Sequence, residues 1–302
     1  MLPKDRSYIE TELQNSNSHQ LHKKNIKECV DLIHKEDERV LYAIQNAKPQ
    51  IQSFLEFAVP EFEKGARVFY IGAGTSGRLG VLDASEIPPT FQMPADRFIG
   101  IIAGGDEALR KSSEGKEDDF NGSHDVLKKF EIKNNDILIG IAAGGTTPYV
   151  LGAFAYSKKI NKKILTCFIT CSQVPKPEHV DHLIYLSTGA EVVTGSTRMK
   201  AGSATKLVLN MISTTIMIQT GRVYDNLMVD VKASNEKLVD RAIRILMKIT
   251  KLNREDSFEL LQSAEMQVKP AIVMFFKKTS LSEASLLIEK HQGRLQFLNE
   301  ER

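Results

Sequence analysis

The sequence predicts an α/β fold in which a doubly wound parallel sheet of five strands is flanked by helices. Five short β-rich runs occupy the middle of the chain, and helix-compatible segments separate them. The runs are continuously apolar rather than alternating, which is typical of strands buried on both faces of a sheet. Strands that alternate with helices are the pattern of a layered α/β domain.

Composition places the chain among ordinary soluble globular proteins. It has 302 residues, of which 42% are hydrophobic and 26% are charged. Its 40 basic and 38 acidic residues are spread along the chain and leave a net charge of +2. A nucleic-acid partner requires a clustered basic face, so we expect none.

Cysteine usage and the start of the chain predict a cytoplasmic protein. Cys29, Cys167 and Cys171 are too few for a disulfide scaffold and lack the spacing of a metal site. The first twenty residues are polar and do not form a signal peptide, and no run of 18 apolar residues exists. We therefore expect no membrane segment.

The N-terminal part, 1–56, is predicted to be a helical segment. Residues 1–20 are polar, and we expect them to be extended or frayed. Apolar residues then recur at helical spacing from 25 to 57, with an interruption at 35–38. This pattern predicts two or three helices.

Residues 57–220 are predicted to form the sheet domain. The five predicted strands are ARVFYIG (66–72), RFIGIIAG (97–104), DILIGIAA (136–143), KKILTCFIT (162–170) and HLIYLS (182–187). After residue 200 we expect no further strand. The segment 199–219 is apolar on nearly every side, which predicts a helix buried inside the domain or against a partner subunit. Residues 221–302 are predicted to form a C-terminal helical region, and about the last 60 of them a small helical bundle.

Three glycine-rich loops follow predicted strands: GAGTSGR (72–78), AAGGTTP (142–148) and TGAEVVTGSTRMK (188–200). Ligands of open α/β sheets bind at the carboxyl ends of strands. Glycine lets backbone N–H groups approach an oxyanion, and the N-terminus of a following helix adds partial positive charge. Three such loops predict an anionic, polyhydroxylated ligand. Its candidate contacts are Gly74, Thr75, Ser76, Gly77, Gly145, Thr146, Thr147, Glu191, Ser196, Thr197 and Lys200.

Other interpretations of these loops fit the residues less well. A dinucleotide site expects an acidic residue about 20 positions after G-x-G-x-x-G, where this chain has Arg97. Tight turns without any ligand remain an alternative. His179 and His182 lack a third metal ligand, and no G-x-S-x-G follows a strand, so neither a metal site nor a nucleophile elbow is expected.

Three long segments carry a family resemblance. GAGTSGRLGVLDASEIPPTF, EVVTGSTRMKAGSATKLVLNM and GRVYDNLMVDVKASNEKL resemble the N-acetylmuramic acid 6-phosphate etherases. These are sugar-isomerase-fold (SIS) enzymes related to the animal glucokinase regulatory protein, and TELQNSN resembles their TE-x-x-N opening. The resemblance implies cleavage of the D-lactyl ether to N-acetylglucosamine 6-phosphate and D-lactate in peptidoglycan recycling. It implies no metal or organic cofactor, and a homodimer with composite sites.

The family's two catalytic glutamates fall on Glu86 and Glu117. Ser76 is expected to be an N-cap, and Pro88 disfavours helix at the residue before it, so we expect a helix that ends near Glu86. The negative end of the helix dipole would favour a protonated Glu86, suited to act as the acid. Glu117 would assist proton abstraction or handle the added water, a role that rests on the resemblance.

One loop departs from the family pattern. Where the family reads AASGRTP, this chain has Gly144 in place of serine and Thr146 in place of arginine. The loss of a hydroxyl that donates to a charged acceptor costs about 1.5–3 kcal/mol. Two other functions stay open from the sequence: a non-catalytic sugar-phosphate sensor and an aldose–ketose sugar phosphate isomerase.

Overall fold

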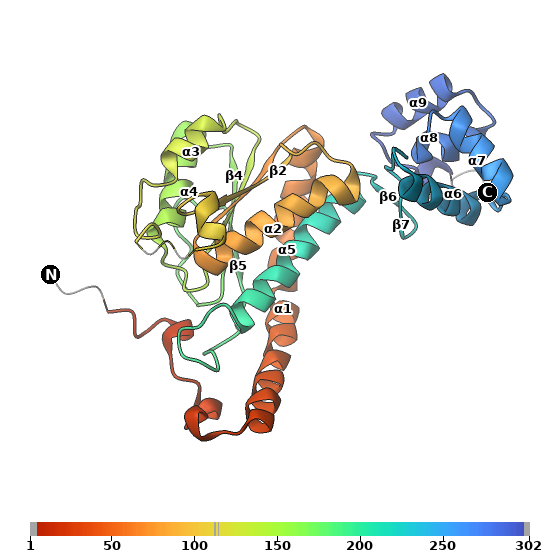
Figure 1. Cartoon of the computed structure of the whole chain (residues 1–302). Helices are drawn as coiled ribbons and strands as arrows, with labels where there is room; N and C mark the ends of the chain where they lie inside the picture. Colours follow the sequence, from red (N-terminus) through yellow and green to blue (C-terminus); the bar gives the residue numbers. More distant parts are fainter. Residues whose placement is uncertain (1–4, 112, 114, 299–302) are drawn as a thin grey trace. The chain divides into compact units, whose positions relative to one another are not determined.

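The computed structural model describes residues 5–111, 113 and 115–298 (Figure 1). The chain divides into two compact units. The first contains the residues up to Glu86 together with Ala95–Ser213, and the second contains Ile87–Pro94 and the residues from Thr214 onward. Among the helices of the described residues, none is long and apolar enough to cross a bilayer.

The first unit is built on a five-stranded, fully parallel sheet, which confirms the predicted fold class. The strand order is β2-β1-β3-β4-β5. All five predicted strands are present, each shorter than its apolar run. They are β1 (Val68–Gly72), β2 (Phe98–Ile102), β3 (Ile137–Ile141), β4 (Leu165–Thr170) and β5 (His182–Tyr185).

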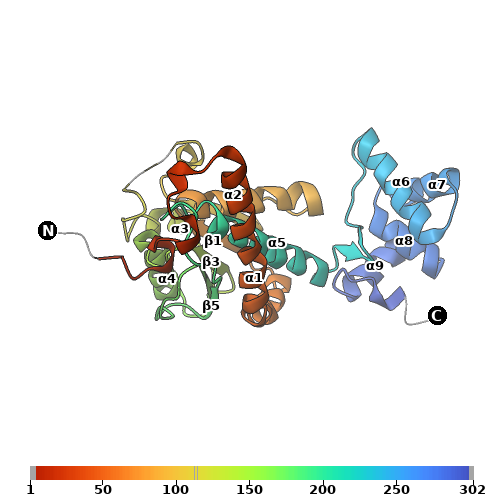
Figure 2. The same cartoon turned by 90° about the horizontal axis from the view of Figure 1, so that it is seen from below.

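Helices cover both faces of this sheet (Figures 1 and 2). Helix α1 (Ile26–Glu63) packs on β3, β4 and β5, and α2 (Gly74–Phe91) covers the Tyr70 side of β1, where a side chain at Gly80 would come within 2.8 Å of the Tyr70 Cβ. On the opposite face, α4 (Pro148–Ile160) packs on β1 and β3 beside α3 (His124–Lys129). Phe69, Phe154 and Phe168 belong to the buried cluster between α4 and the sheet.

Helix α1 is one continuous helix, so the prediction of two or three helices is wrong. It begins with a capping box between Asn25 and Glu28. The buried positions continue at helical spacing to Phe62, and Glu36 within the charged stretch 35–38 is itself buried. The charges therefore do not interrupt the helix, because one of them faces inward.

The N-terminal residues form short turns rather than a frayed segment. The turns are η1 (Glu10–Glu12), η2 (Ser16–Ser18) and η3 (Leu21–Lys23), and a further turn, η4 (Asp106–Leu109), follows β2. Ile9 and Thr11 are buried. The expectation of an extended or frayed start is therefore wrong for the described residues from 5 onward.

Helix α5 (Lys200–Gln219) is only partly covered within the chain. Val208, Leu209 and Ile212 are buried, whereas Leu207 and Met211 are 36% and 40% exposed. Burial on all sides inside the domain is therefore wrong, because one row of apolar side chains on this helix faces solvent in the single chain.

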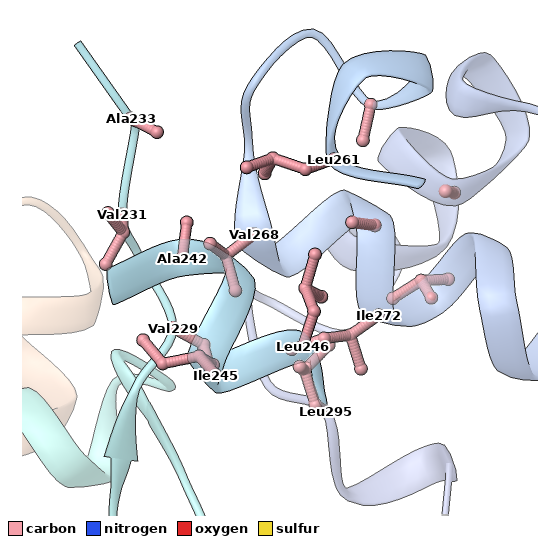
Figure 3. Close-up of a cluster of buried hydrophobic side chains, with 14 of the residues drawn as sticks. Val229, Val231, Ala233, Ala242, Ile245, Leu246, Leu261, Val268, Ile272 and Leu295 are labelled. Carbon is pink, nitrogen blue, oxygen red and sulfur yellow. The ribbon is translucent and has the colours of Figure 1, made fainter. Parts of the chain in front are cut away.

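The second unit is a small helical bundle, as predicted, with a short hairpin before it. Val231, Leu246, Leu261 and Ile272 belong to its core, shown in Figure 3. The hairpin contradicts the expectation that no strand follows residue 200. The elements are β6 (Val223–Tyr224), β7 (Leu227–Met228), α6 (Glu236–Thr250), α7 (Arg254–Ser263), α8 (Val268–Lys277), α9 (Leu281–Lys290) and η5 (Gln296–Leu298).

Candidate active site

The candidate site lies where the strand order reverses. The chain leaves β1 for β2 on one side and later returns to β3 on the other side of β1. Gly72 and Ile141, the last residues of β1 and β3, are register partners. The loops that follow these two strands therefore diverge from neighbouring strand ends, the place where open α/β sheets bind ligands.

The first loop leads directly into helix α2. The helix begins at Gly74, so Ser76 is its third residue and the N-cap prediction for Ser76 is wrong. The first N–H groups of a helix have no intrahelical acceptor and carry partial positive charge. Thr75 and Ser76 lie half-buried in this first turn. A side chain at Gly77 would lie 2.7 Å from the Gly72 carbonyl oxygen, so glycine lets the helix start pack against the strand end.

The second loop turns tightly between β3 and α4. Gly145 has a φ of +74° and donates its N–H to the carbonyl of Ala142 at 3.0 Å. Thr147 is the N-cap of α4, but its side chain makes no capping hydrogen bond. Its hydroxyl is therefore not committed to the helix, and half-buried Thr146 lies beside it.

The third loop is anchored by Glu191 and Lys200. The buried carboxylate of Glu191 accepts the backbone N–H groups of Lys200 at 3.1 Å and of Ala201 at 2.9 Å. Burial raises the pKa of Glu191 above its ordinary value, although these N–H groups act in the opposite direction. The first N–H groups of α5 are thus already bound by the carboxylate of Glu191, whereas the first turn of α2 contains no acidic residue.

Lys200 is also turned inward. Its Nζ lies 2.5 Å from Glu36 Oε2 and donates to the carbonyl of Ala190 at 2.7 Å. Asn15 donates to the same carboxylate at 2.6 Å and Asn17 donates to its other oxygen at 2.7 Å. Burial of Glu36 disfavours its ionised form, but the hydrogen bonds from Lys200, Asn17 and Asn15 outweigh burial and lower its pKa to about 2. This network ties the third loop to α1 and to the N-terminal segment.

The N-terminal segment joins the second and third loops. The Thr11 backbone N–H donates to Ser172 Oγ at 3.4 Å, and the Thr11 carbonyl accepts the N–H of Gly195 at 3.2 Å. A side chain at Gly144 would lie 3.6 Å from Ile9 Cγ2. Composition alone missed this arrangement; the only signal in the sequence was the likeness of TELQNSN to the family's opening.

The first and third loops also meet. A side chain at Gly202, near the start of α5, would lie 3.5 Å from Thr75 Cγ2 and 3.4 Å from the Thr197 carbonyl oxygen. Ser196 and Thr197 are half-buried in the turn before α5. The structure therefore brings the three predicted loops to one edge of the sheet, and the Thr75 side chain of the first loop lies near the start of α5, where the third loop ends.

The two predicted catalytic glutamates lie on different elements of the unit. Glu86 is exposed and stands within α2, which continues through Pro88 to Phe91, so the prediction that the helix ends near Glu86 is wrong. At about 1.5 Å per residue, Glu86 lies ~18 Å along the helix from Gly74. Exposed Glu117 lies beside the start of α4, where its carbonyl accepts the N–H of Tyr149 at 3.0 Å. Glu86 thus stands toward the end of α2 that is farther from the strand-end loops, whereas Glu117 lies beside the second loop.

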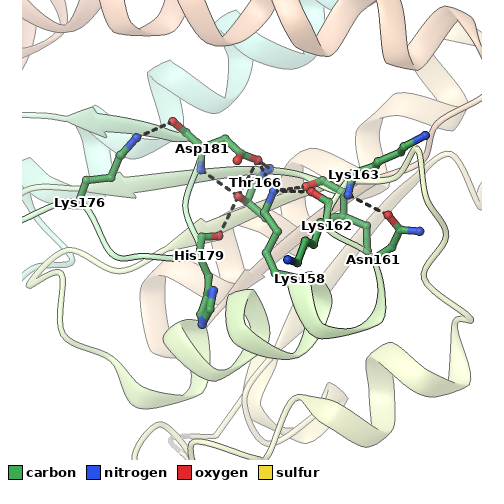
Figure 4. Close-up of polar contacts among 9 residues, drawn as sticks. Lys158, Asn161, Lys162, Lys163, Thr166, Lys176, His179 and Asp181 are labelled. Carbon is green, nitrogen blue, oxygen red and sulfur yellow. Dashed lines mark hydrogen bonds and ion pairs between the residues drawn. The ribbon is translucent and has the colours of Figure 1, made fainter.

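The two histidines before and within β5 have other contacts. The His179 carbonyl accepts from Thr166 Oγ1, and Thr166 also bonds to Asp181, which pairs with Lys158 (Figure 4). The His182 ring packs against Phe57, with ring centroids 5.0 Å apart. In the part of the chain that the structure describes, no three His, Cys, Asp or Glu side chains are grouped as a metal site requires.

Comparison with known proteins fixes the family. The chain is 44% identical over 289 residues to N-acetylmuramic acid 6-phosphate etherase 1 of Bacillus licheniformis, which covers 95% of this chain and 94% of that protein. It is 46% identical to the N-acetylmuramic acid 6-phosphate etherase of Actinobacillus succinogenes, covering 94% and 93%. The chain belongs to the N-acetylmuramic acid 6-phosphate etherase family.

Two family models match parts of this etherase-family chain. The glucokinase regulatory protein N-terminal SIS domain matches residues 50–158, which include the first two loops and both glutamates. The C-terminal lid domain of glucokinase regulatory protein matches residues 225–270.

Solved structures match this chain at low identity. A phosphosugar isomerase involved in capsule formation, from Bacteroides fragilis, is 16% identical, with a TM-score of 0.47, covering 67% of this chain and 94% of that one. The sugar isomerase domain of an RpiR transcription factor from Sphaerobacter thermophilus is 16% identical, with a TM-score of 0.37, covering 59% and 89%.

Proposed function

We propose that this protein is a carbon–oxygen lyase that cleaves the D-lactyl ether of N-acetylmuramic acid 6-phosphate, giving N-acetylglucosamine 6-phosphate and D-lactate. The observation that carries the proposal is the 44% identity to an etherase over 95% of the chain. The geometry of the strand-end loops supports it independently, because it suits a phosphorylated sugar. The reaction belongs to cytoplasmic recycling of cell-wall amino sugars.

The phosphate group binds at the first and second loops. The first-turn N–H groups of α2 supply positive partial charge, and Ser76 and Thr147 supply hydroxyl donors. Because Gly145 has no side chain, it adopts the left-handed backbone conformation of a turn that exposes backbone N–H groups. The proposed contacts to the sugar phosphate are Gly74, Thr75, Ser76, Gly77, Gly145, Thr146, Thr147, Ser196 and Thr197.

Glu191 and Lys200 act mainly on the shape of the third loop. Each side chain is buried, and its charged atoms have partners within the protein. Direct contact with the substrate, as predicted from the sequence, would require both to give up these partners. We assign them the role of holding Ser196 and Thr197 in place.

The reaction requires one base and one acid. In the open-chain aldehyde the proton on C2 is acidic, and a carboxylate removes it. A carboxylic acid protonates the ether oxygen on C3, and lactate leaves. Water then adds at C3 of the unsaturated aldehyde and restores the sugar. Glu86 acts as the acid and Glu117 as its partner, and groups of this kind contribute about 10²- to 10⁴-fold each.

The dipole of α2 does not favour a protonated Glu86. Glu86 lies five residues before the end of α2, outside the last turn, where the negative end of the dipole acts. Its role as the acid therefore rests on the family resemblance. A second subunit that covers this exposed side chain would supply the desolvation that favours a neutral carboxyl group.

Each active site is composite. One copy contributes the strand-end loops and Glu117, and the other copy contributes Glu86. The separation of about 18 Å between Gly74 and Glu86 exceeds the span of a hexose phosphate. The apolar side chains of Leu82, Leu207 and Met211 are exposed on α2 and α5. A homodimer that buries these side chains would carry Glu86 to the partner's site.

A D-lactate assay tests the function directly. The purified chain is incubated with N-acetylmuramic acid 6-phosphate, and both D-lactate and N-acetylglucosamine 6-phosphate are measured. Equal amounts of both products support the proposal. Tight hexose phosphate binding without D-lactate would show a regulatory sensor, and interconversion of aldose and ketose phosphates without lactate would show an isomerase.

A further inference from the structure

The second unit contains a pocket with a charge arrangement that the proposed reaction does not use. It has a volume of about 490 Å³ and lies between the end of α5, the start of α8 and the end of α9. Its lining residues all belong to this unit. Arg222, Asp230 and Lys269 provide its most buried charges, and Glu289 lies exposed at its rim.

Two cations share one buried carboxylate in this pocket. Lys269 Nζ lies 2.9 Å from Asp230 Oδ1, and an Arg222 terminal nitrogen pairs with Asp230 Oδ2. The Lys269 side chain is 7% exposed, and burial lowers the pKa of Lys269, although Asp230 opposes that effect. With Lys269 protonated, the three residues together carry a net charge of about +1.

The two cations have more donors than the carboxylate of Asp230 can satisfy. A guanidinium has five N–H groups and an ammonium has three, whereas a carboxylate accepts about four hydrogen bonds. Among the described residues the buried Nε of Arg222 has no hydrogen-bond partner. A buried donor without a partner carries a desolvation cost, which an acceptor bound in the pocket would remove.

The surroundings keep this space open and fixed. A side chain at Gly293 would lie 3.8 Å from Lys269 Nζ, so glycine at this position keeps a side chain from covering the ammonium from that direction. Val268, next to Lys269, belongs to the buried core of the bundle (Figure 3). Gln267 and Gln292 also line the pocket. Repulsion from Glu289 is weak because that carboxylate is in water.

We propose that this pocket is a binding site for a small oxyanion, either a phosphoryl or a carboxylate group, held by Arg222 and Lys269. The site is separate from the strand-end loops and does not rest on the proposed function. Arg222 Nε–H donates to one oxygen of the anion, and Lys269 Nζ, which lines the pocket, donates to another. Asp230 holds the two cations in position.

The Nε–H resonance of Arg222 tests the site locally in the full-length protein. The resonance is assigned with Arg222→Lys, and wild-type protein is titrated separately with inorganic phosphate and sodium D-lactate at constant ionic strength. We expect a saturable shift with at least one of them, and the effective anion identifies the phosphoryl or carboxylate class. A shift no larger than that given by chloride would overturn the proposal. The titration itself uses wild-type protein, and Arg222→Lys serves only to assign the resonance.

Two variants separate specific binding from a general effect of charge. Lys269→Met is expected to weaken binding of the effective anion by about 10- to 100-fold, because one charge-assisted hydrogen bond is lost. Arg244→Gln removes an exposed arginine from α6 of the same unit and should leave binding within about twofold. Equal weakening in both variants would contradict the site; if Lys269→Met does not fold, the wild-type titration decides.

Discussion

The ammonium of Lys200 lies 2.5 Å from the carboxylate of Glu36, and both side chains are almost inaccessible, at 1% and 4% exposure. Lys200 is the first residue of α5, whereas Glu36 lies on α1, more than 160 positions earlier in the chain. This pair fixes the third loop against the N-terminal half of the first unit. Through Asn15 and Asn17, which donate to the same carboxylate, it also links the N-terminal residues to the candidate site.

Glu36→Gln is expected to destabilise the protein by about 3 kcal/mol, because it leaves the ammonium of Lys200 buried without a counter-charge. Denaturant unfolding of the two proteins measures the difference. Asp31→Asn on the same helix removes an exposed carboxylate paired with Lys27 and should cost less than about 1 kcal/mol. Equal losses would show that the buried pair has no special role.

The stability that Glu36 provides should depend on pH in a defined range. Its pKa is lowered from an ordinary 4.5 to about 2 in the folded protein. A lowered pKa stabilises the fold at pH values above the unfolded pKa, and this contribution is lost as pH falls through the folded pKa. The difference in unfolding free energy between wild type and Glu36→Gln should be constant above about pH 5 and shrink between pH 4.5 and 2. A difference that grows as pH falls would contradict the network.

Gly144→Ser is expected to tighten sugar phosphate binding by roughly tenfold. A Cβ at this position would make ordinary contacts, 3.6 Å from Ile9 and 3.8 Å from Thr11 Oγ1, so the serine fits. Calorimetric titration with N-acetylglucosamine 6-phosphate measures the change. Gly144→Ala fills the same space without a hydroxyl and should show no gain; a gain in the alanine variant would assign the effect to packing.

Gly77→Ala is expected to destabilise the first unit by about 1–3 kcal/mol. The new Cβ would lie 2.6 Å from Ile102 Cγ1 and 2.7 Å from the Gly72 carbonyl oxygen, and the backbone atom cannot easily move away. Thermal unfolding measures the loss. Unfolding at the wild-type temperature would show that α2 does not pack against β1 as closely as described.

The fold class could be predicted because its signals are local. Continuous apolar runs and intervening helical segments mark each strand of the sheet without knowledge of its neighbours. The positions of the three glycine loops follow from the same reasoning, since parallel strands end at one edge. The start of α2 at Gly74, by contrast, depends on close packing of Gly72 against Gly77.

The parts that were missed depend on contacts between distant residues. Glu36 looks like part of a solvated charge run until Lys200 is placed beside it. Thr11 looks solvated until Ser172 and Gly195 are placed around it. Pro88 stops a helix in many sequences, but here α2 continues past it to Phe91. No local pattern contains these partners.

Mixing two inactive variants tests the central claim, that Glu86 and Glu117 from different copies serve one site. Glu86→Gln and Glu117→Gln are each expected to lose nearly all D-lactate release. If the two are unfolded and refolded together, half of the dimers are mixed, and one of the two sites in each mixed dimer is intact. We predict recovery of about one quarter of wild-type activity. A mixture that stays as inactive as the separate variants would contradict the shared site.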